Sequence, residues 1–108
     1  MTPKGSLLHY LAEHAARHPE RVAIRFRERS FTYREVDEAA ARCRGALAAQ
    51  GIRAGERVAL LMSVSPETIF ALLGVMGLGA IAVPCNTLLP TEGLAYVLKD
   101  SGAKLVVT

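Results

Sequence analysis

Residues 68–91 read TIFALLGVMGLGAIAVPCNTLLPT and contain no charged side chain, although a glutamate bounds the stretch on each side. Such a stretch is either a membrane span or the buried helix and strand at the centre of a parallel sheet. A span requires about 20 mostly apolar residues, and residues 69–85 approach that length. Three closely spaced glycines and a proline interrupt them, which favours a helix, a break and a strand. We therefore expect no membrane span.

The composition is typical of a globular domain. The chain has 108 residues, of which 51% are hydrophobic and 21% are charged, so disorder is not expected. Basic side chains exceed acidic ones only by 13 to 10, and the arginines are interspersed with acidic residues, which argues against a nucleic-acid surface. Cys43 and Cys85 form no CxxC pair, and the N-terminus lacks the apolar core of a signal peptide. We expect free thiols in a cytoplasmic protein.

The first third of the chain predicts a helix and a β-hairpin. Ser6 can cap a helix with leucines at helical spacing, and Pro19 ends it. Apolar residues beginning with Val22 alternate with arginine and alanine over residues 21–27, which predicts a strand with one wet face. After a short turn, residues 30–32 return as its partner.

A capping box begins the longest predicted helix. The hydroxyl of Thr32 can accept from the backbone N–H of Glu35, whose carboxylate can reach back to Thr32. Apolar residues then recur at helical spacing over residues 33–50. Gly51 stands where a left-handed C-cap belongs.

From residue 57 onward the pattern predicts alternating strands and helices. Ser65, Pro66 and Glu67 combine a capping hydroxyl, a proline in the first turn and a carboxylate at the positive end of the helix dipole. Thr91 is expected to cap the next helix, and Gly102 to end it. The expected order is a strand at 57–62, a helix at 66–78, a strand at 80–83, a loop at 84–90, a helix at 92–101 and a strand at 104–108. The fold class is α/β with a mostly parallel sheet.

Three local patterns suggest chemistry that their context does not support. Residues 77–82 match the letters of a dinucleotide fingerprint, but a helix precedes the glycines and a strand follows, which is the reverse of the required order. Ser63 and Ser65 could face a phosphate, but the turn at residues 62–66 holds no basic side chain, so a structural cap is expected. His14 and His18 share a helix face without a third ligand nearby, so no metal site is expected.

Several motifs resemble the adenylate-forming (AMP-binding) superfamily. Residues 31–36 (FTYREV) resemble its first core motif, and residues 51–59 (GIRAGERVA) resemble its G-x-x-x-G-D-x-V-A segment with glutamate in place of aspartate. Residues 76–84 (MGLGAIAVP) resemble its second core motif, in which Gly77 and Leu78 replace the usual lysine and alanine. Asn86 and Thr87, with residues 94–104, are similar to the acyl-CoA synthetase branch, including aryl-CoA ligases.

The resemblance implies an enzyme that uses ATP and Mg to convert a carboxylic acid into an acyl-adenylate and pyrophosphate, and then transfers the acyl group to CoA. The family's phosphate loop, nucleotide motifs and catalytic lysine lie downstream of the matched region. Residues 1–108 are therefore expected to be the N-terminal portion of the first subdomain, and to be inactive alone because phosphoryl chemistry needs positioned charge. An aromatic or fatty acid is the expected substrate, and the remainder of the ligase chain the expected partner.

The same resemblance places the loop after the second motif near the side from which CoA enters. Pro84, Asn86 and Thr87 are therefore the candidate ligand contacts, and a purely structural loop is the alternative. No catalytic or metal-binding residue is expected here. Two other interpretations stay open, a free-standing α/β binding domain and a membrane-associated protein, while an amino-acid-adenylating domain fits less well because it more often has aspartate after the proline. The uncovered sheet is expected to favour self-association.

Overall fold

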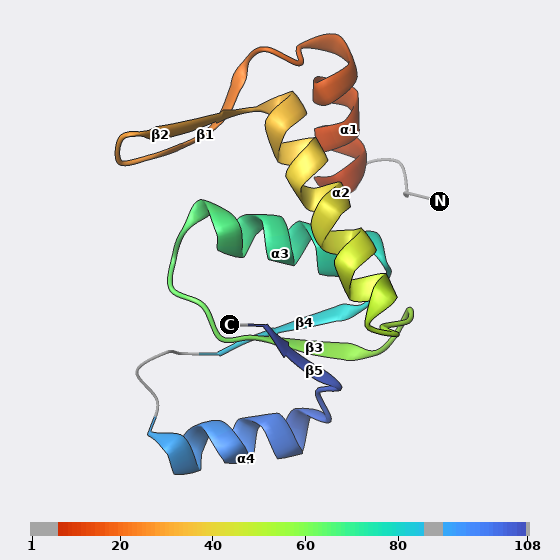
Figure 1. Cartoon of the computed structure of the whole chain (residues 1–108), viewed down its shortest axis with the longest axis vertical. Helices are drawn as coiled ribbons and strands as arrows, with labels where there is room; N and C mark the ends of the chain where they lie inside the picture. Colours follow the sequence, from red (N-terminus) through yellow and green to blue (C-terminus); the bar gives the residue numbers. More distant parts are fainter. Residues whose placement is uncertain (1–6, 86–89, 108) are drawn as a thin grey trace.

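The computed structural model describes residues 7–85 and 90–107 and confirms the expected α/β fold (Figure 1). A helix and an antiparallel hairpin come first, and a long helix connects them to a parallel three-stranded sheet. Ser6, Asn86, Thr87 and Thr108 lie outside the described residues.

The elements are α1 (Leu7–Arg17), β1 (Val22–Phe26), β2 (Arg29–Thr32), α2 (Tyr33–Ala49), β3 (Arg57–Leu60), α3 (Pro66–Gly77), β4 (Ile81–Pro84), α4 (Thr91–Ser101) and β5 (Leu105–Val107).

The sheet has the strand order β4-β3-β5, and both pairings are parallel. Ala59 of β3 lies opposite Val83 of β4 and Val106 of β5. Helices α2 and α3 cover one face, and α4 lies on the other side (Figure 1). All three apolar residues of β3 are buried, as expected of a central strand enclosed on both faces.

The core consists of two apolar clusters that share the α2–α3 pair. One joins the sheet to both helices through Leu47, Val58, Leu60 and Val75. The other joins α2 and α3 to α1 and the hairpin, with Phe70 meeting Phe31 edge to face at 5.2 Å between ring centroids. Helices α2 and α3 therefore hold the N-terminal elements against the sheet.

The hairpin departs from the simple alternation expected over residues 21–27. An irregularity in the register lies between Val22 and Ile24, where Val22 pairs with Thr32 and Ile24 with Phe31. A bulge reverses the faces on which neighbouring side chains lie. Ala23, Ile24 and Phe31 consequently pack against the core, while Val22 is 41% exposed.

Local signals at both ends of α2 are confirmed. Both hydrogen bonds of the capping box are present, from Glu35 N–H to Thr32 Oγ1 at 3.2 Å and from Thr32 N–H to Glu35 Oε1 at 2.9 Å. At the other end Gly51 has a φ of 87°. Ile52 N–H donates to Leu47 C=O and Gly51 N–H to Ala48 C=O, which is a Schellman motif.

The apolar stretch of residues 68–91 resolves as expected into a helix, a break and a strand. Ser65 caps α3, Pro66 occupies its first turn, and the break falls at Gly79, which has a φ of 72°. Gly74 lies where α3 crosses α2, because a Cβ there would stand 2.7 Å from Cys43 Cβ. Among the described residues no helix is long and apolar enough to cross a membrane.

Three expectations about the second half of the chain are corrected. Thr91 is the first residue of α4 and not its cap, and Pro90 precedes the helix without a side-chain hydrogen bond to it. Pro84, expected in the loop, is the last residue of β4, and β3 ends at Leu60, before Met62. The parallel ladder explains both changes at the strands, because it pairs Leu60 with Pro84 and ends there.

Candidate functional site

The carboxyl edge of the sheet is the place where this topology would hold a ligand. All three strands are parallel, so the segments that follow β3, β4 and β5 leave from one edge. The connection from β3 runs to one side, and the connection from β4 returns past β3 to the other. In open α/β sheets, ligands bind at the carboxyl edge beside such a reversal.

Pro84 lies at this edge and is exposed. The next residue, Cys85, is 8% exposed, and its N–H donates to Leu60 C=O at 2.9 Å. Its thiol donates to Val83 C=O at 3.5 Å. The backbone hydrogen bond and the buried side chain of Cys85 thus hold the chain in place directly after β4. The other two candidate contacts, Asn86 and Thr87, lie outside the described residues.

In the neighbouring turn between β3 and α3, the Ser65 hydroxyl and the Ser63 carbonyl oxygen bond to Thr68 at the start of the helix. The Oγ1 of Thr68 donates to Ser63 C=O at 2.5 Å and lies 3.1 Å from Ser65 Oγ. The Oγ of Ser65 also accepts from Thr68 N–H at 3.4 Å. The turn is the structural cap expected from the sequence.

Glu67, the acidic residue that directly follows this turn, is bound by an arginine. Two hydrogen bonds, at 2.8 and 3.1 Å, join Arg29 of β2 to Glu67 in the first turn of α3. The hydrogen bond from Arg29 lowers the pKa of Glu67. The sequence placed Arg29 in a turn and suggested no partner, because the two residues are 38 positions apart.

The described residues of the edge therefore hold a loop in place but contribute no acid or base of their own. Among residues 61–66, 84–85 and 90 there is no Asp, Glu, Lys, Arg or His. Residues 7–85 and 90–107 likewise contain no group of three or more His, Cys, Asp and Glu side chains able to hold a metal ion. These residues do not fit the needs of a triphosphate or of Mg, which are positive charge and carboxylate ligands.

The two histidines considered as metal ligands belong to an aromatic cluster. The ring of His14 stacks on Tyr33 at 5.0 Å between centroids and lies 4.6 Å from Tyr10. The ring centroid of His18 is 6.1 Å from that of His14. The cluster packs α1 against the start of α2, so its arrangement has a structural explanation.

Comparison with known proteins identifies the family. A family model described as AMP-binding enzyme matches residues 11–108. The chain belongs to the AMP-binding enzyme family. The N-terminal subdomain of Klebsiella oxytoca NpsA, solved with anthranilyl-AMSN, has the same fold, with a TM-score of 0.87 and 31% identity over 95% of this chain and 27% of that one.

Curated relatives of this chain include both a CoA ligase and a peptide synthetase. The 3-hydroxybenzoate–CoA/4-hydroxybenzoate–CoA ligase of Thauera aromatica is 44% identical over 81% of this chain and 17% of its own length. One of the plipastatin synthase proteins of Bacillus subtilis (strain 168) is 43% identical over 100% of this chain and 4% of its own length. The chain thus spans a small part of each relative, and its identity does not separate CoA ligases from peptide synthetases.

Proposed function

We propose that this chain is the N-terminal segment of an ATP-dependent ligase that converts a carboxylic acid into an acyl-adenylate and then transfers the acyl group to CoA. The observation that carries the proposal is the family match over residues 11–108. The identity of 44% to a hydroxybenzoate–CoA ligase supports CoA as the acceptor.

In this proposal the segment positions a loop, and the reacting groups belong to parts of the enzyme outside it. Pro84, Asn86 and Thr87 contact CoA from the carboxyl edge of the sheet. The exposure of Pro84 and the anchoring of Cys85 on Leu60 support this role. Residues outside this segment would hold ATP and Mg, because the described edge has no charged ligand for either.

An aromatic acid is the proposed substrate. The Thauera relative is named for hydroxybenzoates, and the NpsA structure contains an anthranilyl compound. Both support a planar aromatic carboxylate over a long alkyl chain.

The test uses the intact protein encoded by the native gene. We expect acid-dependent exchange between ATP and pyrophosphate with benzoate-type acids in a panel that also contains fatty acids and amino acids. Addition of CoA should then yield a thioester detectable by mass spectrometry. An intact protein that exchanges pyrophosphate with none of these acids would refute the proposal.

A second candidate is adenylation of an amino acid, as part of a peptide synthetase. The 43% identity to the plipastatin synthase relative over the whole chain favours it. The same panel separates the candidates, because this enzyme would exchange pyrophosphate with an amino acid and form no CoA thioester.

A further inference from the structure

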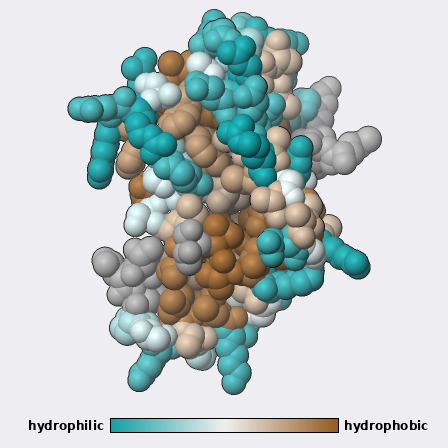
Figure 2. Space-filling model, in the orientation of Figure 1, coloured by the Kyte–Doolittle hydropathy of each residue, from teal (hydrophilic) through white to brown (hydrophobic). Residues whose placement is uncertain are grey.

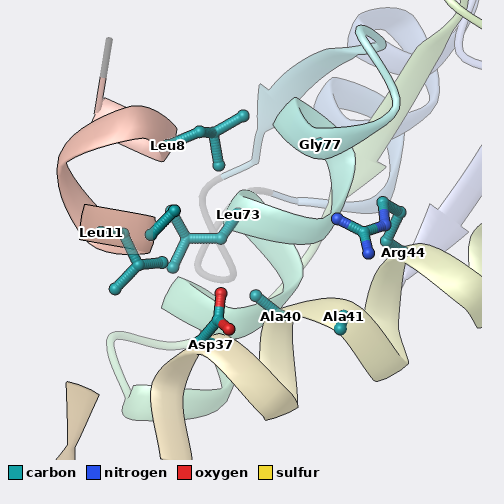
Figure 3. A pocket seen from close by; sticks show the side chains of 9 residues that line it. Leu8, Leu11, Asp37, Ala40, Ala41, Arg44, Leu73 and Gly77 are labelled. Atoms are coloured by element: carbon teal, nitrogen blue, oxygen red, sulfur yellow. The ribbon is translucent and has the colours of Figure 1, made fainter. Parts of the chain in front are cut away.

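A hollow lies toward the end of α3 that is farther from the carboxyl edge. It has a volume of about 150 Å³, lies between α1, α2 and α3 and is open to solvent, since its two charged residues, Asp37 and Arg44, are exposed (Figure 3). Because α3 begins at the carboxyl edge and runs back across the sheet, Gly77 at its end lies beside the amino ends of the strands. The hollow is therefore separate from the candidate site at Pro84. Its lining consists of Leu8, Leu11, Ala12, Asp37, Ala40, Ala41, Arg44, Leu73 and Gly77.

Small side chains explain why the three helices leave space here. Ala40 and Ala41 of α2 and Gly77 of α3 all line the hollow, so part of its wall has short side chains or none (Figure 3). A methyl group on Gly77 would stand 3.1 Å from Cδ of Arg44, so the stem of that arginine lies against the glycine.

Opposite charges line the hollow along one helix. Asp37 and Arg44 are seven residues apart on α2 and both point into the space (Figure 3). Neither is joined to another described residue by an ion pair or a side-chain hydrogen bond, whereas Arg29, Arg34 and Lys104 each bind a glutamate. Two unpaired opposite charges over an apolar floor suit a ligand that carries both complementary charges.

The spacing of the two charges limits the ligand. Their Cα atoms are about 10 Å apart along the helix, at ~1.5 Å per residue. Helical side chains lean toward the N-terminus, so the long arm of Arg44 extends toward Asp37 and shortens the gap. The remaining span suits an ammonium and a carboxylate joined by a short methylene chain, which would lie against Leu8, Leu11 and Leu73.

We propose that the junction of α1, α2 and α3 is a binding site for a small ω-amino acid, with the ammonium group at Asp37 and the carboxylate at Arg44. The geometry carries the assignment, which does not depend on the adenylating function proposed above. Arg44 would donate two parallel hydrogen bonds to the carboxylate. Asp37 would accept from the ammonium group.

The probe for this site is 5-aminopentanoate, titrated into the intact protein by isothermal calorimetry. ATP and carboxylic-acid substrates are left out so that no turnover contributes heat, and the variants described below distinguish binding at this junction from binding elsewhere. A dissociation constant on the order of 1 mM is expected, because both charges remain partly solvated. Pentanoate and pentylamine, which each lack one charge, should bind at least about tenfold more weakly.

Three variants decide whether the observed binding belongs to this junction. Asp37→Asn and Arg44→Gln should each weaken binding of 5-aminopentanoate at least about tenfold. Arg42→Gln is the matched control, since Arg42 is on the same helix but lines a different hollow, with Glu35 and Glu38. Circular dichroism should show that all three variants fold like the wild-type protein.

Two results would overturn the assignment. One is the absence of binding by the wild-type protein, and the other is equal binding by the wild type and the Asp37→Asn and Arg44→Gln variants. Either result would leave the adenylation proposal unaffected, since pyrophosphate exchange is measured separately.

Discussion

Gly74 shows how one residue controls the distance between the two central helices. A Cβ at this position would lie 2.7 Å from Cys43 Cβ and 3.0 Å from the backbone nitrogen of Arg44. Burial of Cys43 at the same crossing raises the pKa of its thiol. The sequence showed Gly74 only as an interruption of an apolar helix, because the partner that requires a glycine lies on another element.

Replacement of Gly74 by alanine should therefore destabilise the protein. The added methyl group must displace backbone atoms of α2, and overpacking of this kind typically costs about 1–3 kcal/mol. Urea denaturation of the intact protein would measure the loss.

Gly45→Ala is the matched control for that variant. Gly45 is also within a helix, but a Cβ there meets nothing within 4 Å. Alanine is preferred to glycine in a helix by up to about 1 kcal/mol, so this variant should be as stable as the wild type or more so. Equal destabilisation by both substitutions would contradict a specific role for Gly74.

Helix ends decide much of the fold at the scale of single elements. The cap of α2 is complete, with Thr32 and Glu35 bonded to each other's backbone N–H groups, and these bonds also lower the pKa of Glu35. The start of α4 has no comparable side-chain bond. The sequence predicts a threonine cap for both helices, but in the structure only α2 has one.

The two threonines should respond differently to alanine. Thr32→Ala removes an N-cap, which typically costs about 1 kcal/mol of stability. Thr91→Ala removes no cap and should change the free energy of unfolding by much less. Chemical denaturation of the two variants side by side would test this, and an equally large loss from Thr91→Ala would show that its hydroxyl does cap α4.

Elements distant in sequence are joined by an ion pair at the amino edge of the sheet. Lys104, just before β5, binds Glu56 at 3.0 Å and donates to Gly51 C=O at 3.0 Å. The hydrogen bond from Lys104, followed by one from Arg53 N–H, lowers the pKa of Glu56. The pair fastens the C-terminal strand to the connection between α2 and β3.

This pair predicts a pH dependence of stability. Because the pKa of Glu56 in the folded protein is below its unfolded value of about 4.3, its contribution is fully present above that value and is lost as the pH falls through the folded pKa. Glu56→Gln should therefore lose less stability than the wild type between pH 7 and pH 3.

Thermal unfolding across that pH range would measure the difference between the two proteins. Glu92→Gln is a suitable control, because Glu92 has no ion pair within the described part of the chain. Parallel stability curves for Glu56→Gln and the wild type would contradict the prediction.

At the scale of the whole molecule, the isolated chain leaves apolar surface in contact with solvent. Figure 2 shows apolar side chains gathered over the sheet region, and Ile81 and Val106 on the two outer strands are 47% and 40% exposed. Helix α4 has no buried residue. A further apolar hollow of about 220 Å³ lies between α2, α3 and β5.

Residues 1–108 expressed alone should consequently self-associate. Open strand edges and exposed apolar patches favour association. Sedimentation velocity should show species larger than a monomer, increasing with protein concentration, and the preparation should exchange no pyrophosphate. A monomer at all concentrations would show that the exposed surface is not adhesive.

The sequence by itself determined the type, order and approximate limits of every described helix and strand. Capping residues, glycines and the periods of the apolar residues are local signals, and they act within a few positions of one another. The motifs around Thr32, Gly51 and Pro84 are equally local, and they sufficed to indicate the family. They do not indicate the branch, and overall identity does not either, since it is 44% to the Thauera CoA ligase and 43% to the plipastatin synthase relative.

Only the tertiary structure decided how these elements meet. The strand order, the bulge at Ala23, the bonds from Arg29 to Glu67 and from Lys104 to Glu56, and the hollow beside Asp37 and Arg44 all join positions that lie far apart or on different elements. The physical reason is that such contacts depend on the packing of α2 against α3 and the sheet. Residues near one another in the chain do not encode that packing by their spacing alone.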